Sequence, residues 1–330
     1  MPYLIPEILF GIGKKLIEDG NLKAMIKFGF SGKESLNVLK NVFASISTIK
    51  IFDYQIGIGW NQKCSNFDGE TFPKCFLNCI GGNVKNLYIE REINPIFQTI
   101  IDKIISKKQL VSFSAGKNSY CSNTLKMDKF LPIFSSTLKD LKIPSRALVD
   151  EIIDSLHLKT LSLENCFNLN FQILYRCIKE NGSTSKFFSS IKDITIIDKT
   201  GEMTSFLYSA NILINPNCSL QTFFFNMKYN GYIKRDIQAL TNEIKNSNYF
   251  PSNVVYTVLS NGVYLNEEFT SVKYLDLQRD ICKDFIHESS NSRFHCFHQT
   301  FKTANSHDVL FKVLIPKSQK LVSERNRFIY

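Results

Sequence analysis

The sequence predicts a mixed α/β protein, in which a short N-terminal helical unit precedes an irregular solenoid with a curved parallel sheet and helices outside it. The first 45 residues carry apolar side chains at helical spacing, interrupted by Gly20 and again by Ser31 and Gly32. The rest of the chain alternates short strand patterns with helical stretches at an irregular period. We therefore divide the chain into a helical unit at 1–45 and a repeat-like domain at 46–330.

Three groups of apolar residues in the first unit have helical spacing. They are Leu4, Ile8, Leu9, Ile12 and Leu16, then Leu22 and Ile26, and finally Leu36, Leu39 and Phe43. Pro6 and Glu7 suit the first turn of a helix, because proline lacks the amide proton that would be unpaired there and an acid complements the helix dipole. Three helices this short cannot bury their own apolar faces, so either a partner or the rest of the chain must cover them.

The order of residues in this unit resembles the F-box. The start Leu4, Ile5, Pro6 and Glu7 is similar to a Leu-Pro-x-Glu-like opening, and Ser31 to Lys33 is similar to the Ser-Lys-like step before the third helix. Ile5 stands where leucine is usual, and the typical Trp or Arg near the motif's end is absent. The resemblance implies docking on the adaptor subunit of a cullin–RING ubiquitin ligase. The residues that would bury against the adaptor are Leu4, Pro6, Ile8, Leu9, Ile12, Leu16, Leu22 and Ile26. The alternative is an ordinary helical cap on the domain that follows.

A pattern of the form apolar-x-x-apolar-x-apolar recurs through the rest of the chain. It starts at Ile46, Val84, Leu110, Leu138, Leu158, Ile191, Leu220, Val272 and Leu310. The intervals are 38, 26, 28, 20, 33, 29, 52 and 38 residues, and several lie near the period of leucine-rich repeats, which the pattern resembles. The copy at Leu158 continues to Cys166, as such repeats do. Helical patterns lie between the copies at 96–105, 148–156 and 233–244.

The alternative to a repeat array is a single α/β domain with ordinary crossover connections, which would carry a Gly-rich phosphate loop. Gly57 with Gly59, and Gly81 with Gly82, lack that spacing, so we interpret them as turns. Asn261 and Gly262 predict a β-hairpin inside the longest interval.

In a repeat array the concave strand face would hold a protein target. The outward positions of the predicted strands that we expect there are Lys139, Lys142, Thr160, Ser162, Lys192, Thr195, Thr222, Phe224, Tyr274 and Asp276.

The chain has 40 Lys and Arg against 30 Asp and Glu, a formal net charge of +10. Such a balance is typical of nucleic-acid binding. Lysine outnumbers arginine 32 to 8, however, and arginine is the better bidentate ligand of phosphate. The basic residues are also scattered, with Lys107 and Lys108 among the densest groups. The sequence therefore argues against a nucleic-acid partner. Because Lys139, Lys142 and Lys192 fall on the predicted repeat strands, we expect a protein target with an acidic patch.

Nine cysteines at irregular spacing argue against a disulfide framework, so we expect an intracellular protein of the cytoplasm and/or nucleus. No apolar stretch is long enough to predict a membrane span. His295 and His298 are spaced so that both could bind one metal ion. Structural zinc, however, needs four ligands in spaced pairs, and the sequence does not supply the second pair. We predict no metal, no cofactor and no catalytic residue, because no nucleophile elbow, phosphate loop or His-Glu-x-x-His motif is present.

These observations predict a substrate-recognition subunit of a cullin–RING ubiquitin ligase that is not itself an enzyme. Two other hypotheses stay open: a leucine-rich-repeat interaction scaffold without a ligase, and a basic nucleic-acid-binding protein.

Overall fold

The structure, a computed structural model, describes residues 5–61, 63–116, 125–144, 147–164, 190–198, 222–227, 241–242, 245–246, 254–260, 284–288, 294–302, 304, 306 and 308–316. Contacts within the chain divide it into two compact units, Met1–Lys142 and Ile143–Tyr330. We call them unit 1 and unit 2. The boundary that the sequence predicts between 45 and 46 falls inside unit 1, and it stays a prediction.

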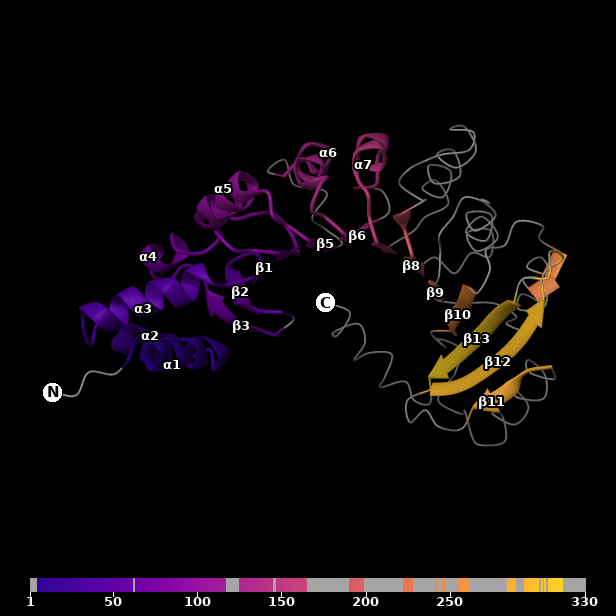
Figure 1. Cartoon of the computed structure of the whole chain (residues 1–330), viewed down its shortest axis with the longest axis horizontal. Coiled ribbons are helices and arrows are strands. Elements are labelled where there is room, and N and C mark those ends of the chain that lie inside the picture. Colours follow the sequence, from indigo (N-terminus) through magenta and orange to yellow (C-terminus); the bar gives the residue numbers. More distant parts are fainter. Residues whose placement is uncertain are drawn as a thin grey trace. The chain divides into compact units, whose positions relative to one another are not determined.

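The three predicted N-terminal helices are present (Figure 1). They are α1 (Pro6–Glu18), α2 (Leu22–Gly29) and α3 (Lys33–Ala44). Pro6 occupies the first turn of α1. Gly20 follows the end of this helix and has a positive φ of 68°, which turns the chain toward α2. A Cβ added at Gly13 would lie 3.2 Å from Val42 Cγ2, so a glycine permits the close crossing of α1 and α3.

The described residues of unit 1 include six strands in a mostly parallel arrangement. They are β1 (Thr48–Ile51), β2 (Gln55–Trp60), β3 (Lys63–Asp68), β4 (Asn86–Ile89), β5 (Ser112–Ala115) and β6 (Asp140–Pro144), the last of which crosses the boundary between the units. Strands β1, β4, β5 and β6 pair in parallel and in chain order, whereas β1, β2 and β3 pair antiparallel. The coarse prediction of a mixed α/β fold with a parallel sheet is therefore confirmed in this unit.

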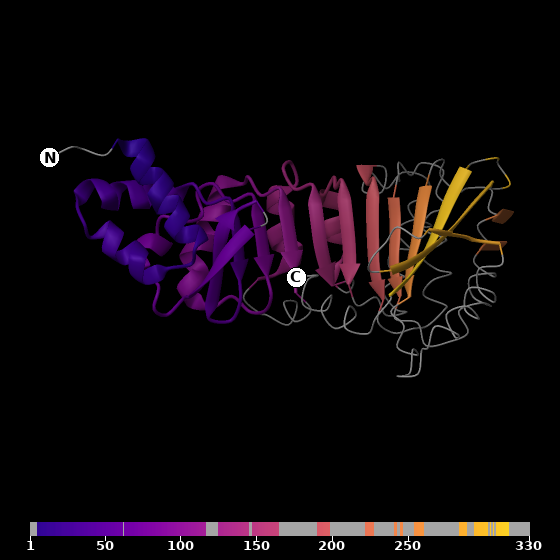
Figure 2. The same cartoon turned by 90° about the horizontal axis from the view of Figure 1, so that it is seen from below.

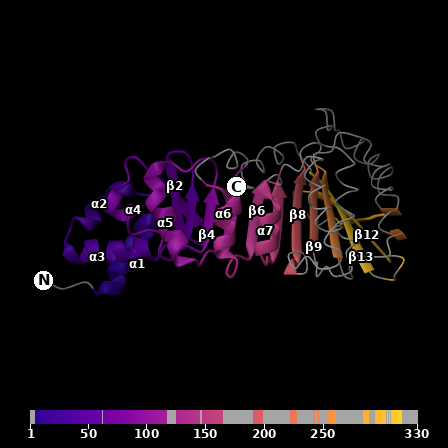
Figure 3. The same ribbon diagram turned by 90° about the horizontal axis from the view of Figure 1, so that it is seen from above.

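Helices of unit 1 cover one face of its strands. They are α4 (Lys74–Leu77), η1 (Pro95–Phe97), α5 (Gln98–Lys107), α6 (Met127–Phe130) and η3 (Leu131–Phe134). Figure 3 shows α5 and α6 in front of the strands, and Figure 2, from the opposite side, shows the strands in front. Phe113 of β5 lies beneath Phe130 of α6, with ring centroids 5.6 Å apart. One part of the described core of unit 1 therefore lies between its strands and these helices.

After the end of β6, the first helix described in unit 2 is α7 (Asp150–Ser155), which falls within the predicted helical stretch 148–156. Its strands are β7 (Thr160–Glu164), β8 (Asp193–Asp198), β9 (Thr222–Met227), β10 (Val254–Ser260), β11 (Ile286–Glu288), β12 (Phe294–Lys302) and β13 (Asp308–Pro316). The first four pair in parallel and in chain order, β13 continues the parallel series beside β10, and β12 and β11 add antiparallel pairs. Unit 2 is therefore also a mixed α/β structure with mostly parallel strands.

The same backbone irregularity recurs where parallel strands begin. The carbonyl oxygen of Ser47 accepts hydrogen bonds from two consecutive amides, those of Lys85 and Asn86, at 2.9 and 3.0 Å. The carbonyl oxygens of Lys85, Val111 and, in unit 2, Lys159 each accept a consecutive pair in the same way. Such two-to-one pairing is a bulge, which sets the register of a strand. The described triads that start at Ile46 to Ile191 all have this arrangement: apolar residues of the strand that follows the junction are buried.

Two sequence interpretations are wrong. Gly57 and Gly59 lie within strand β2, and a Cβ at Gly59 would collide with the backbone of β3. The predicted hairpin at Asn261 does not form with β10, because both sides of β10 pair in parallel with β9 and β13. The predicted helix 233–244 and the triad at Val272 lie outside the described ranges, apart from residues 241 and 242. At the C-terminal triad the first predicted apolar position, Leu310, is only half-buried. Its neighbours Val309 and Phe311, which are not part of the triad, are buried.

Candidate protein-binding site

Helix α1, together with its N-cap residue Ile5, carries two adjacent rows of small and apolar residues, and the core uses only one of them. Leu9, Gly13 and Ile17, spaced four residues apart, are buried. Ile5, Ile8 and Ile12 form the neighbouring row and are 56%, 47% and 39% exposed. We call Ile5, Ile8 and Ile12 the isoleucine stripe. An amphipathic helix of a closed domain needs one apolar row, so the stripe exceeds what the packing of unit 1 requires.

Burying the stripe would stabilise a complex appreciably. The three exposed fractions together correspond to about one and a half fully exposed isoleucines. Burying one such side chain is worth roughly 1.5–3 kcal/mol, so covering the stripe would be worth roughly 2–4 kcal/mol. That is about 30- to 900-fold in affinity before other terms are counted.

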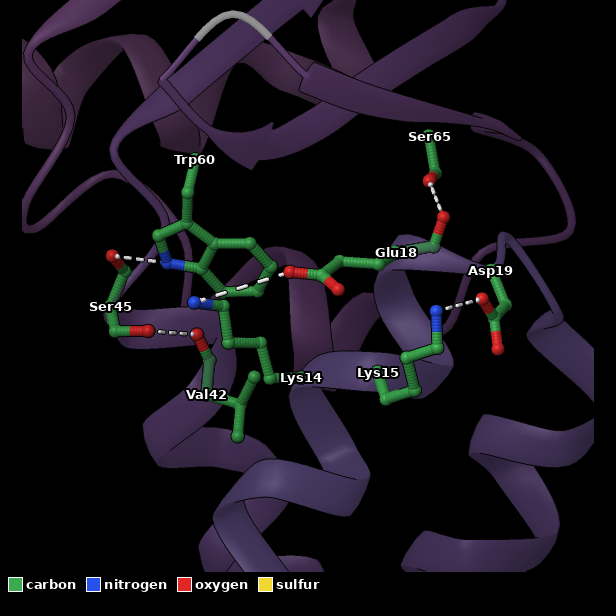
Figure 4. Close-up of polar contacts among 8 residues, drawn as sticks. All are labelled: Lys14, Lys15, Glu18, Asp19, Val42, Ser45, Trp60 and Ser65. Atoms are coloured by element: carbon green, nitrogen blue, oxygen red, sulfur yellow. Dashed lines mark hydrogen bonds and ion pairs between the residues drawn. The ribbon is translucent and has the colours of Figure 1, made fainter.

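The side of α1 that carries Lys14 and Glu18 is held against strands β2 and β3 (Figure 4). The Trp60 indole Nε1 donates a 3.1 Å hydrogen bond to the carbonyl oxygen of Ser45, and Lys14 Nζ lies 5.0 Å from the centroid of the Trp60 ring. Ser65 Oγ donates to the carbonyl oxygen of Glu18 at 2.7 Å. These contacts fix the orientation of α1, so the stripe is presented on an ordered surface and binding does not have to order it.

Helix α3 also joins the rest of unit 1 through a cluster of aromatic rings. Phe43 stacks on Phe76 with centroids 4.8 Å apart and meets Phe72 edge-on at 5.6 Å. Asn83 Nδ2 donates to the carbonyl oxygen of Ala44 at 2.8 Å. The helical unit therefore packs on the strands behind it while α1 leaves its second row uncovered by described residues.

The predicted adaptor-binding residues occupy three different environments. Pro6, Ile8 and Ile12 are exposed; Leu16, Leu22 and Ile26 are half-buried; Leu9 is buried; and Leu4 lies outside the described residues. Leu9 supports α1 from the inside and cannot contact a partner without local rearrangement. The structure adds Phe30, which follows α2 and is 81% exposed. Its only signal in the sequence is a large aromatic residue directly before the Ser31–Gly32 break.

The predicted target-binding residues lie along the strands of the two units. In unit 1, Lys142 belongs to a cross-strand row with Ser114 and Tyr88. In unit 2, Ser162, Thr195 and Phe224 share one row, and Thr160 and Thr222 both pair with Asp193 in the next row. Lys139 and Lys192 are exposed one residue before β6 and β8, and Tyr274 and Asp276 lie outside the described residues.

The half-buried strand positions alternate with buried ones. Lys142, Thr160, Ser162 and Thr195 are half-buried, and their neighbours Leu141, Leu161, Leu163 and Ile194 are buried. This alternation is what a sheet with one covered face requires. Within each unit, these positions form a polar surface that could contact a partner.

The histidine and cysteine groups show no constellation for metal or covalent chemistry in the described ranges. Positions 295 and 298 pair with Ile315 and Lys312, and residues three apart in a strand fall on opposite faces of the sheet. No group of three or more His, Cys, Asp or Glu among the described residues could hold a metal ion. Burial raises the pKa of the Cys64, Cys79 and Cys296 thiols above the usual value, which is opposite to the shift that activates a nucleophile.

Comparisons of the chain with protein-family models, with curated proteins and with solved structures found no match. The resemblance to the F-box and to leucine-rich repeats therefore depends on the residues quoted above and stays a prediction. None of the helices in the described part of the chain combines the length and apolar character needed to cross a membrane.

Proposed function

We propose that this chain is the substrate-recognition subunit of a cullin–RING ubiquitin ligase. In this proposal α1 binds the adaptor subunit through the isoleucine stripe, and the strand domain binds a protein target. The chain breaks no bond itself, because the ligase chemistry belongs to other subunits. The single observation that carries the proposal is the uncovered row of Ile5, Ile8 and Ile12 beside a buried row that already closes the helical unit.

We also propose that the strand domain is an irregular leucine-rich-repeat solenoid. Three features support this. Parallel strands follow one another in chain order within each unit. The bulged junction recurs at the same position of the pattern. Helices α5 and α6 of unit 1 lie on one face of its strands, as in a repeat array (Figure 3). A single crossover domain would place helices on both faces of a parallel sheet.

Replacing Ile8 and Ile12 by glutamine tests adaptor binding without harming the helix. Glutamine has a helix propensity at least as favourable as that of isoleucine, and both positions are exposed. We expect the double variant to bind purified adaptor roughly 10- to 100-fold more weakly. The substitutions remove an exposed apolar area close to that of one whole isoleucine side chain, and binding would bury two side-chain amides at a cost in free energy. Binding is measured by titration of the full chain with the adaptor, followed by a pull-down.

The matched control is Lys23→Gln with Lys27→Gln, two exposed positions of α2 with the same four-residue spacing. This variant should bind the adaptor as the natural chain does. If the natural chain fails to bind the adaptor, or if the stripe variant binds equally well, the proposal is wrong.

A second candidate is an interaction scaffold in which the helices are only a cap. The observation that favours it is the contact network that holds the helices to the strands, above all Trp60 on Ser45 and Phe43 on Phe76. In that case no adaptor binds, and the isoleucine-to-glutamine variant differs from the natural chain in no binding assay.

A further inference from the structure

A lysine recurs at one position of the strand pattern, directly before the strand. Lys85, Lys139, Lys159 and Lys192 each follow the first apolar residue of a triad and lie one residue before β4, β6, β7 and β8. The backbone of each takes part in the bulged junction described above. All four side chains are exposed. The repeating backbone therefore places a lysine directly before β4 and β6 in unit 1 and before β7 and β8 in unit 2, whereas Ser47 and Val111 hold this position before β1 and β5.

In unit 1 these lysines join others at the edge where the parallel strands begin. The segments that reach this edge are 44–47, 59–63, 82–85, 106–111 and 135–139. They contain five lysines and no aspartate or glutamate: Lys63, Lys85, Lys107, Lys108 and Lys139. We call these five residues the lysine edge. All five are exposed, and none forms an ion pair with another residue in the described part of the chain.

Around β1 to β4, the opposite edge of the strands carries the opposite charge. The segments 52–55, 68–71 and 90–93 contain five acidic residues and a single arginine. The acids are Asp53, Asp68, Glu70, Glu90 and Glu92. Arg91 pairs with Asp53 at 2.9 Å. The net charge of the whole chain hides this separation, because charge around β1 to β4 is sorted along the strand direction.

We propose that the lysine edge of unit 1 binds an acidic, extended polypeptide segment of a protein partner. Neighbouring strands lie about 4.8 Å apart, so Lys85 and Lys139, two strands from each other, are roughly 10 Å apart at the backbone. Same-side residues of an extended chain recur about every 6.6 Å, and flexible lysine stems can bridge the difference. The inference deepens the proposed function, because it assigns the chemistry of the target and moves its site from the strand face to the strand edge.

Polypeptide fits this edge better than nucleic acid. The five segments contain lysine but no arginine, and arginine is the residue that reads phosphate and base edges through two bonds. Single-stranded nucleic acid also needs open aromatic faces for stacking. The one aromatic residue in the segments is Trp60, whose indole nitrogen is bonded to Ser45 and whose ring lies beneath Lys14.

A purely structural role for these lysines makes a different prediction. Helix α5 ends at Lys107, and cations stabilise the C-terminal end of a helix by about 0.3–1 kcal/mol. If the lysine edge served only this purpose, its removal would lower the free energy of unfolding and leave ligand binding unchanged.

The test uses the full chain and a fluorescein-labelled poly-glutamate peptide. The edge variant replaces Lys85, Lys107, Lys108 and Lys139 by glutamine. Each exposed charge pair contributes about 0.5 kcal/mol, so the variant should bind about 30-fold more weakly. Its binding should also depend less on salt between about 50 and 200 mM. The control variant replaces the exposed helix residues Lys23, Lys27, Lys33 and Lys74 by glutamine. It has the same net charge and should bind like the natural chain.

Three results would overturn the inference. They are equal weakening by both variants, which would show an effect of net charge alone; no weakening by the edge variant; and tighter binding of oligothymidine than of poly-glutamate to the same edge. Failure here is distinguishable from failure of the proposed function. The Ile8→Gln, Ile12→Gln chain should keep poly-glutamate binding, and the edge variant should keep adaptor binding.

Discussion

Replacing Phe43 by alanine should destabilise the helical unit and the adjoining strands together. Phe43 lies in α3 and is fully buried. Its ring stacks on Phe76 of α4 and meets Phe72 edge-on. Both partners follow β3 in the chain, so the cluster joins residues on either side of the predicted boundary at 45. The substitution therefore tests whether that boundary separates two independently stable parts.

The expected loss is large. Truncation of a buried phenylalanine costs about 3–5 kcal/mol, from lost transfer free energy and from the cavity that remains. Aromatic pairs add about 0.5–1.5 kcal/mol beyond area, so we expect the upper half of that range. A typical domain has only about 5–15 kcal/mol of stability. The control is Phe30→Ala, which removes the same side chain at a position 81% exposed and should change stability by less than about 0.5 kcal/mol.

Hydrogen exchange with peptide-level readout measures where the stability is lost. We expect faster exchange in α1, α2 and α3 and also in β1, β4 and β5, because one aromatic cluster supports both sets of elements. If exchange accelerates only within residues 1–45 and the strands keep their protection, the helices form a separate domain. The argument from the Phe43 cluster would then be wrong.

Two further predictions concern α1 and a thiol. Gly11→Ala should raise the free energy of unfolding by about 0.5–1 kcal/mol, because no atom lies within 4 Å of the added Cβ. Gly13→Ala should raise the free energy of unfolding by less than Gly11→Ala does, because its Cβ would lie 3.2 Å from the fully buried Val42 of α3. Equal urea midpoints for the two variants would contradict this packing. Burial raises the pKa of Cys64 above its usual 9.0, so folding favours the protonated thiol. The stability that this pKa shift contributes is present below pH 9.0 and is lost as the pH rises further. The rate of iodoacetamide alkylation at Cys64, followed by mass spectrometry, should therefore reach half its maximum above pH 9.0, with the exposed Cys75 as an internal reference; a midpoint below 9.0 would contradict it.

The sequence predicts the helices and the parallel strands well, because both depend on local apolar periodicity. The helical spacing of Ile100, Ile101 and Ile104 in α5 corresponds to buried positions, and so do the triads that start at Ile46, Val84 and Leu138. The hairpin of β2 and β3 has no such signal. Gly57 and Gly59 suggest turns, and only the close approach of the neighbouring strand explains why glycine stands inside β2.

Strand β10 and the lysine edge show a second kind of limit. Val254–Ser260 has a clear strand pattern, but Asn261 and Gly262 favour a local hairpin over a distant parallel partner. Pairing with β9 and β13 is non-local, and a single sequence carries no direct signal for it. The lysines are visible one by one in the sequence, yet their common edge depends on strand register. Counting runs of like charge along the chain therefore misses them.

The cap and the adaptor-binding hypotheses are compatible, because they use different sides of the same helix. Leu9, Gly13 and Ile17 pack inward, and the flank with Lys14 and Glu18 meets the strands. A helix that served only as a cap would gain solubility from polar residues on its remaining surface. Instead, four of the six exposed large hydrophobic residues in the described part of the chain fall within residues 1–45. Single exposed apolar residues are ordinary, but such a concentration in one small unit is not. The stripe of three isoleucines is therefore better explained by a partner than by the fold, and substituting it while keeping the inward row separates the two roles.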